Sequence, residues 1–262
     1  MGGVVCSLFL VSSLVFAHQQ SWTATWTMSG GAGLLVFSVG WWGFGAGVTE
    51  LIPSWTGFLV LTVAGERLEL ARLFGLSRVA KTTFQIAMAL VLLSAFIATW
   101  NLAISEPLLG AGLVALSLWL GQYDIVRHQD RGFGLIRFVN TALLLGYGWM
   151  FLGGCLWLIY GGPLGGLFYD AALHRIFVGF VFSMVFAHAP LVFPAVTGLS
   201  LPFHRGLLLP FLFLDASLAL RIVGGLSGNS PIRQWGGLLS VGSIILFFIL
   251  LQLGRIYTKK TP

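Results

Sequence analysis

The stretch from Ile136 to Tyr160 reads IRFVNTALLLGYGWMFLGGCLWLIY and contains no Asp, Glu, Lys or Arg after Arg137. A helix needs roughly 20 mainly apolar residues to cross the hydrocarbon core of a bilayer, and this stretch is long enough. Its apolar residues are continuous and do not alternate with polar ones as in a transmembrane β-barrel. Because hydrocarbon offers no hydrogen-bond partners, the backbone N–H and C=O groups must bond to one another, and a helix allows this within one segment.

The rest of the chain has a similar composition, with 57% hydrophobic and only 8% charged residues among 262. A soluble domain has about 25% charged residues, so this chain cannot cover a water-facing surface. We therefore predict an all-α fold, a polytopic bundle of eight or nine transmembrane helices that forms a single integral membrane domain over residues 1–262. Nine segments are long and apolar enough to span a bilayer: 3–18, 31–49, 54–74, 83–104, 107–123, 136–160, 171–196, 206–225 and 235–256.

Glycine and proline mark the expected ends of these helices, because both residues punctuate regular structure. The predicted junctions lie at Pro53, Pro107, residues 161–163, Pro202 and Pro231. The first segment ends in Val15-Phe16-Ala17, which is similar to a signal-peptidase site, but the segment lacks a positively charged start. Its removal would leave eight helices instead of nine.

The net charge of +6 comes from basic residues in short loops between the apolar segments. Apart from Arg233, the basic residues of the loops fall on one side of the predicted bundle, which the positive-inside rule makes cytoplasmic. We therefore expect an integral protein of the bacterial inner membrane, with the lipid bilayer as a partner, the N-terminus outside and the C-terminus in the cytoplasm. The basic residues are not interleaved with exposed aromatic ones as in a nucleic-acid groove, so no nucleic acid is expected as a partner.

Two charged residues, Arg67 and Asp215, are predicted to lie inside the membrane at similar depths on antiparallel helices. Intramembrane charges cost about 2.5–3.5 kcal/mol each on insertion scales and usually face a partner inside the bundle. We predict that they form a buried charge pair. This pair either fixes the register of the helices or belongs to a proton path or a heme site, where the fork of Arg67 would bind propionates.

Two histidines of one predicted helix, His174 and His188, are 14 residues apart. On an α-helix this spacing corresponds to about 21 Å of rise and about 40° of rotation, so both imidazoles are predicted on one face. Membrane cytochromes of the b type ligate two stacked hemes with a similar spacing. The alternatives are that His188 is a hydrogen-bonded core histidine and that Asp170 only caps the helix of His174.

A histidine that ligates a metal through one ring nitrogen needs a hydrogen-bond partner for its other ring nitrogen. We expect Asp170 or a backbone carbonyl to be this partner for His174. His204 is a candidate second ligand together with His18 and His128, although His204 and His128 could also be ordinary loop residues. All three are predicted on the cytoplasmic side, where they can serve His188 but not His174. A heme at His174 therefore needs a methionine or another partner, or it is five-coordinate and open to a gas.

The residues His174, Gly179 and Met184 form the pattern H-x4-G-x4-M. Over this one helix the chain resembles a segment of the NnrS family of membrane proteins, which contain heme and copper and are associated with bacterial nitric oxide metabolism. The resemblance implies that heme or copper binds near His174, with Met184 in the same site.

Two functions follow as expectations. The first is a membrane protein that binds heme or a redox metal such as copper in electron transport or in a response to nitric oxide or another gas. The second is an accessory or structural subunit of a larger respiratory or photosynthetic complex, because the loops are short and no hydrophilic domain is present. A transporter is less favoured because inverted repeats are not found, and no Ser/His/Asp set or HExxH motif indicates a hydrolase.

Overall fold

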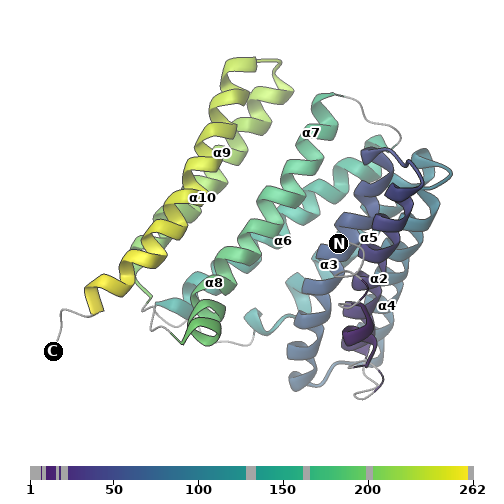
Figure 1. Ribbon diagram of the computed structural model, residues 1–262, viewed down its shortest axis with the longest axis horizontal. Coiled ribbons are helices and arrows are strands. Elements are labelled where there is room, and N and C mark those ends of the chain that lie inside the picture. Colours follow the sequence, from purple (N-terminus) through teal and green to yellow (C-terminus); the bar gives the residue numbers. More distant parts are fainter. Residues whose placement is uncertain are drawn as a thin grey trace. The chain divides into compact units, whose positions relative to one another are not determined.

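The computed structural model describes residues 7, 10–15, 18, 23–127, 134–161, 166–198 and 203–258 (Figure 1). These residues form helices and no strand, which confirms the all-α prediction. The chain divides into two compact units: unit 1 comprises residues 1–128 and 150–164, and unit 2 comprises residues 129–149 and 165–262. Helix α6 (Leu135–Tyr160) contributes its first part to unit 2 and its last part to unit 1. The single domain over residues 1–262 stays a prediction.

Unit 1 consists of helical hairpins joined by short turns. Its helices are α2 (Thr23–Gly43), α3 (Val48–Ala71), α4 (Arg78–Ile97) and α5 (Leu102–Tyr123), with the short 3-10 turns η1 (Arg72–Phe74) and η2 (Ile125–Arg127). Helix α5 also touches the last part of α6, because a Cβ atom on Gly110 would lie 2.6 Å from the carbonyl oxygen of Gly154. Small residues allow such backbone-to-backbone contact between membrane helices.

Unit 2 contains one long interrupted helix and a helical hairpin. The elements are α7 (Leu167–His174), the π-helix η3 (Arg175–Val181), α8 (Phe182–Thr197), the 3-10 turn η4 (Arg205–Leu207), α9 (Leu208–Leu226) and α10 (Ser230–Thr258). Helices α9 and α10 lie side by side in Figure 1. Phenylalanines form its core, where the rings of Phe186 on α8 and Phe247 on α10 stack with centroids 3.8 Å apart.

Two predicted helix junctions are wrong, because Pro53 lies inside α3 and Pro107 lies inside α5. Each proline is the sixth residue of its helix, so it removes only one hydrogen bond beyond the first turn, where amides have no internal partner anyway. The chain turns earlier instead, at Gly45 with its φ of 93° and at Asn101, whose side chain accepts a hydrogen bond from the amide of Ile104.

Among the described residues, seven helical segments are long and apolar enough to cross a membrane, so the protein is an integral membrane protein. The prediction was eight or nine. The first predicted segment, 3–18, lies largely outside the described residues, and α2 starts at Thr23 instead of the predicted residue 31. Helix α2 has 21 residues but is not one of the seven, because Thr, Ser, Gly and Trp make it less apolar.

Candidate functional site

Three side chains of unit 2 meet where α7 packs against α9: Asp170, His174 and Arg221, here called the His174 cluster. The Nη2 of Arg221 donates to Oδ1 of Asp170 at 2.8 Å. The Nδ1 of His174 lies 2.8 Å from the carbonyl oxygen of Asp170 and 3.4 Å from its Oδ1. The arrangement joins a cation, an anion and an imidazole from two helices.

Local helix geometry brings Asp170 and His174 together, since residues four apart lie on the same face. The carboxylate of Asp170 lies in the first turn of α7, where the helix dipole favours a negative charge. It does not cap the helix, because Gly166 occupies the N-cap position. The alternative reading of Asp170 as a cap is therefore wrong, and its side chain is available to Arg221.

Two glycines of α10 make room for Arg221. A Cβ atom on Gly236 would lie 2.6 Å from Cα of Arg221, so α9 and α10 touch at this point. A Cβ atom on Gly237 would lie 2.7 Å from Nη1 of Arg221, so the guanidinium occupies the space above this glycine. The hairpin therefore directs Arg221 toward α7 and away from lipid.

A cavity of about 310 Å³ opens beside the His174 cluster. It is lined by His174, Val178, Arg221, Gly237, Ser240, Val241 and Ile244. Ser240 is engaged with Ser217, whose hydroxyl lies 2.8 Å away, and with the carbonyl oxygen of Gly236 at 2.9 Å. By contrast, Nε of Arg221 is buried and has no hydrogen-bond partner among the described residues. The cavity thus combines apolar walls with the guanidinium of Arg221.

The tautomer of His174 follows from its contact with Asp170. A carbonyl oxygen can only accept, so Nδ1 of His174 carries the proton in this hydrogen bond. In the neutral ring the Nε2 atom then has a lone pair, and it makes no hydrogen bond to the described residues. The predicted contact between Asp170 and His174 is present, whereas its role beside a metal ligand stays a prediction.

The segment after His174 is a π-helix of seven residues, Arg175–Val181. Its hydrogen bonds run from i to i+5, so each turn contains more residues than an α-helical turn. The regular α-helix assumed between His174 and His188 is therefore wrong, and the predicted rotation between their rings does not apply. A π-helix inside an α-helix occurs frequently at functional sites.

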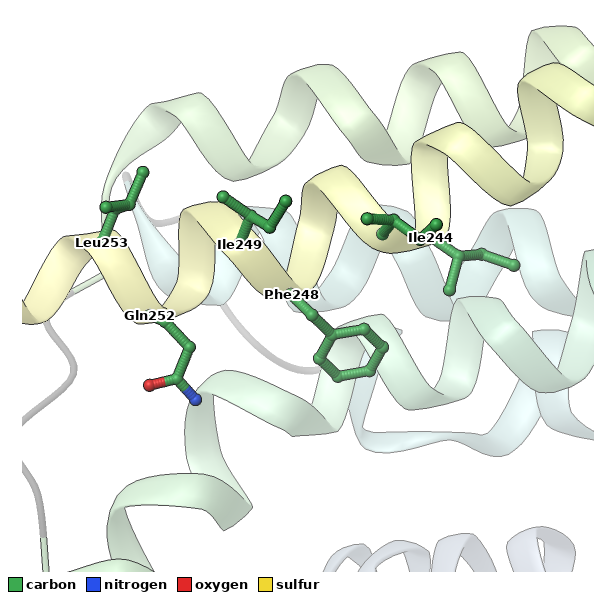
Figure 2. Close-up of a pocket in the computed structure, with 6 residues that line it drawn as sticks. Ile244, Phe248, Ile249, Gln252 and Leu253 are labelled. Atoms are coloured by element: carbon green, nitrogen blue, oxygen red, sulfur yellow. The ribbon is translucent and has the colours of Figure 1, made fainter.

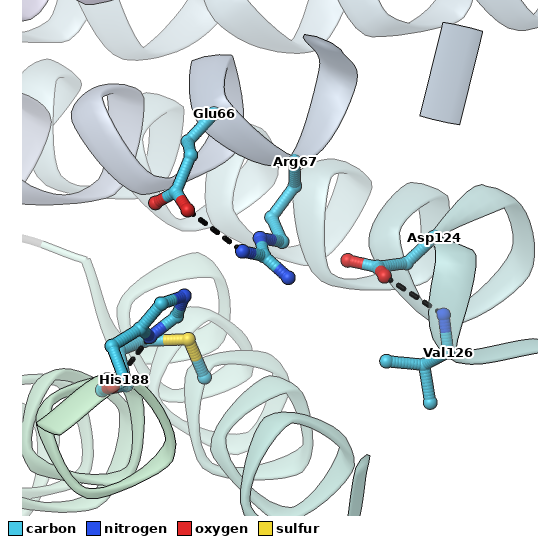
Figure 3. A network of polar contacts seen from close by, with 6 residues as sticks. Glu66, Arg67, Asp124, Val126 and His188 are labelled. Carbon is cyan, nitrogen blue, oxygen red and sulfur yellow. Dashed lines mark hydrogen bonds and ion pairs between the residues drawn. The ribbon is translucent and has the colours of Figure 1, made fainter. Parts of the chain in front are cut away.

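The other residues predicted for the heme site do not line this cavity. The Nδ1–H of His188 donates to the carbonyl oxygen of Met184 at 2.6 Å (Figure 3). Met184 is buried and packs against Gly146 of α6, as an apolar core residue does. The Nε2 of His204 lies 3.0 Å from the carbonyl oxygen of Leu250 and connects the loop before η4 to α10. His128 lies outside the described residues.

Arg67 and Asp215 each have a partner within their own unit. The Nη2 of the buried Arg67 lies 2.8 Å from Oε1 of Glu66 in unit 1 (Figure 3). In unit 2, Oδ1 of Asp215 accepts a hydrogen bond from the indole of Trp149 at 2.6 Å. The direct pairing of Arg67 with Asp215 stays a prediction, because the two residues belong to different units.

The sequence-based site missed Arg221, although Arg221 is an intramembrane charge and such residues usually have a functional partner. A comparison of the membrane depths of charged residues could have found Arg221. It lies near the end of α9 and Asp170 lies near the start of α7, so both are expected at the same side of the membrane. Among the described residues, no group of three or more His, Cys, Asp or Glu side chains could hold a metal ion. The site therefore offers a single imidazole and a guanidinium.

Comparisons with known proteins place the chain in a family but name no activity. No curated protein and no solved structure matches it. One family matches residues 3–254, nearly the whole chain, and its description is "domain of unknown function (DUF8744)". The protein is therefore a member of the DUF8744 family.

Proposed function

We propose that the protein binds a heme through Nε2 of His174 and has a redox role or a role related to nitric oxide or another gas. The observation that supports this proposal is the hydrogen bond from Nδ1 of His174 to the carbonyl oxygen of Asp170. Metal-ligating histidines almost always donate their other ring N–H in this way, which fixes the ring and its tautomer. The second nitrogen of His174 is then available beside the cavity.

The residues present fit a heme better than a copper ion. A heme needs only one or two protein ligands, whereas copper sites in proteins use several His, Cys or Met side chains. Among the described residues, His174 is the one imidazole that lines the cavity, which agrees with a single protein ligand and an open position on the iron. When bound, such a heme supplies gas binding or one-electron chemistry.

The cavity beside His174 is small but lies next to a larger apolar surface. The cavity of about 310 Å³ is at the small end of known ligand sites. However, Ile244 lines both this cavity and a neighbouring apolar groove of about 550 Å³ on α10 (Figure 2). A large ligand bound at His174 would therefore extend along this exposed apolar face of α10.

An optical spectrum of the purified protein tests the proposal. We expect a Soret band that shifts when nitric oxide or carbon monoxide is added, and we expect His174→Ala to abolish it. His204→Ala is the matched control, because it removes an imidazole that does not line the cavity. A wild-type protein that takes up no heme, or a His174→Ala variant with an unchanged spectrum, would contradict the proposal. Metal analysis of the same sample tests for copper.

The proposed setting is a bacterial inner membrane, with the N-terminus outside and the C-terminus in the cytoplasm. The described basic residues that support this orientation include Arg72, Arg78, Lys81, Arg127 and Arg205, which all follow outward-to-inward helices. Reporter fusions after Arg131 and after Lys260 should both give cytoplasmic signals, and a fusion near Pro163 should give an external one. The His174 cluster would then lie near the external side.

A place in a larger membrane complex is the second candidate. Helices α4 and α10 support it, since both expose rows of large apolar side chains. Lipid alone can cover such surfaces, so the measurement is the mass of the protein extracted in a mild detergent from its own membrane. A mass equal to that of one chain would exclude this candidate.

A further inference from the structure

We propose that Arg221 binds the acidic end of the ligand in the His174 cavity, and that the recognised group is a carboxylate on an otherwise apolar molecule. The inference rests on the proposed function for one ligand only, heme, whose two propionates are such carboxylates. Recognition of the carboxylate by Arg221 depends only on the residues around the cavity.

The guanidinium of Arg221 has unused hydrogen-bonding capacity. It has five N–H groups in a planar fork, and its hydrogen bond to Asp170 uses Nη2 and a single carboxylate oxygen. Nε is buried without a partner among the described residues. Nη1, which lies beside Gly237 on the cavity wall, makes no hydrogen bond to the described residues and therefore lacks an acceptor. A carboxylate matches this fork because it can accept two parallel hydrogen bonds.

The space around Arg221 also favours an acceptor from outside the chain. A Cβ atom on Gly237 would lie 2.7 Å from Nη1, so a larger side chain at this position would displace the end of the guanidinium. Ser240, the other polar side chain on this wall, is already bonded to Ser217 and to the carbonyl oxygen of Gly236. No described residue on the wall therefore supplies the missing acceptor.

The other residues that line the cavity favour a ligand that is apolar apart from its acidic group. Val178, Val241 and Ile244 line the cavity away from Arg221. From Ile244 the surface continues down α10 as the groove of Figure 2, which is lined by Ile244, Ile245, Phe248, Ile249, Gln252 and Leu253. The distance from Gly237 to Leu253 along α10 is about 24 Å. The site thus has an acid-binding end at Arg221 and a long apolar wall.

The carboxylate of Asp170 opposes the binding of a second carboxylate. It already neutralises Arg221, so an acidic ligand must compete with it for the guanidinium. Asp170→Asn removes this competing charge and keeps the backbone carbonyl that holds His174. We therefore expect Asp170→Asn to bind an acidic ligand more tightly than the wild type does.

The test compares heme with heme dimethyl ester, in which both propionates are capped, on the purified full-length protein in detergent. Wild type should bind heme about tenfold more tightly than the ester, as expected for hydrogen bonds to a charged group. Arg221→Gln should lose this preference, and Asp170→Asn should increase it. Arg233→Gln is the matched control, since Arg233 lies near the start of α10, as Gly237 does, but does not line the cavity.

Equal binding of heme and its ester by the wild type would overturn the inference and leave the heme proposal intact. If the wild type binds neither porphyrin, the heme proposal fails, and oleate and oleyl alcohol then provide the comparison. A preference for oleate that disappears in Arg221→Gln would support recognition of the acid, and equal binding of the two would overturn it. The wild-type comparisons need no variant, so they show whether the protein recognises the acidic group even if Arg221→Gln does not fold.

Discussion

The charged residues of α3 in unit 1 differ from those of the His174 cluster in unit 2, although both lie within membrane helices. Arg67 pairs with Glu66 on α3, and Arg72 in the adjoining turn η1 pairs with Glu69 of α3, each over 2.8 Å between residues close in sequence. In unit 2, by contrast, Arg221 of α9 pairs with Asp170 of α7 over the same distance. Pairs within one helix need no tertiary structure, whereas the Asp170–Arg221 pair connects two helices beside a cavity.

The Arg72–Glu69 pair also differs in exposure from the Asp170–Arg221 pair, although Arg67 of unit 1 is only 6% exposed. The side chains of Arg72 and Glu69 are 45% and 32% exposed, whereas those of Arg221 and Asp170 are 19% and 25% exposed. Water screens the first pair more than the second, so its contribution to stability should be smaller. The same residue types therefore form a local pair in unit 1 and connect two helices beside a cavity in unit 2.

Asp170→Ala should show the largest effect, because it leaves the guanidinium of Arg221 without its carboxylate. Loss of one partner from a fully buried pair costs 3–5 kcal/mol, and partial exposure reduces our estimate to about 2 kcal/mol. The measurement is thermal unfolding in detergent, followed by circular dichroism. The double variant Asp170→Ala with Arg221→Leu should be more stable than Asp170→Ala alone, and a less stable double variant would contradict the argument.

Gly236→Ala should destabilise unit 2 by about 1–2 kcal/mol, because the added methyl group would collide with the backbone of α9. This collision should also move Arg221 and weaken ligand binding. Gly242→Ala on the same helix is the control, since nothing lies within 4 Å of its added Cβ atom. Unfolding temperatures that fall equally in both variants would show that the α9–α10 contact is not the cause.

Trp149→Phe tests a second connection between helices in unit 2. It removes the indole N–H that donates to Asp215, and we expect a loss of about 1 kcal/mol, the net contribution of a typical intramolecular hydrogen bond. Trp235→Phe, at a position that is 62% exposed, should change the unfolding temperature little. If the two variants behave alike, the hydrogen bond to Asp215 contributes nothing measurable.

Glu69→Ala should show the smallest effect, at most about 0.5 kcal/mol, because the i,i+3 pair with Arg72 is partly exposed. The same unfolding assay measures it, with Asp170→Ala as the reference. A loss of stability as large as that of Asp170→Ala would show that the Arg72–Glu69 pair contributes as much as the Asp170–Arg221 pair.

Much of the fold could be predicted from the chain alone. Helix α6 was expected over 136–160 and spans Leu135–Tyr160, and the α9 segment was expected over 206–225 and spans Leu208–Leu226. Both predictions rest on the length of an apolar run, which is a property of consecutive residues. The junctions at Pro53 and Pro107 were wrong, since the effect of a proline depends on its distance from the helix start.

The sequence by itself determined that this is an all-α integral membrane protein and that His174 and Asp170 lie on one helical turn. Tertiary structure alone decided that Arg221 joins them, that Gly237 leaves space for its guanidinium, and that a cavity opens there. The physical reason is the range of each interaction. Burial of apolar runs and contacts between residues four apart are encoded locally, whereas an ion pair between α7 and α9 depends on how the helices pack.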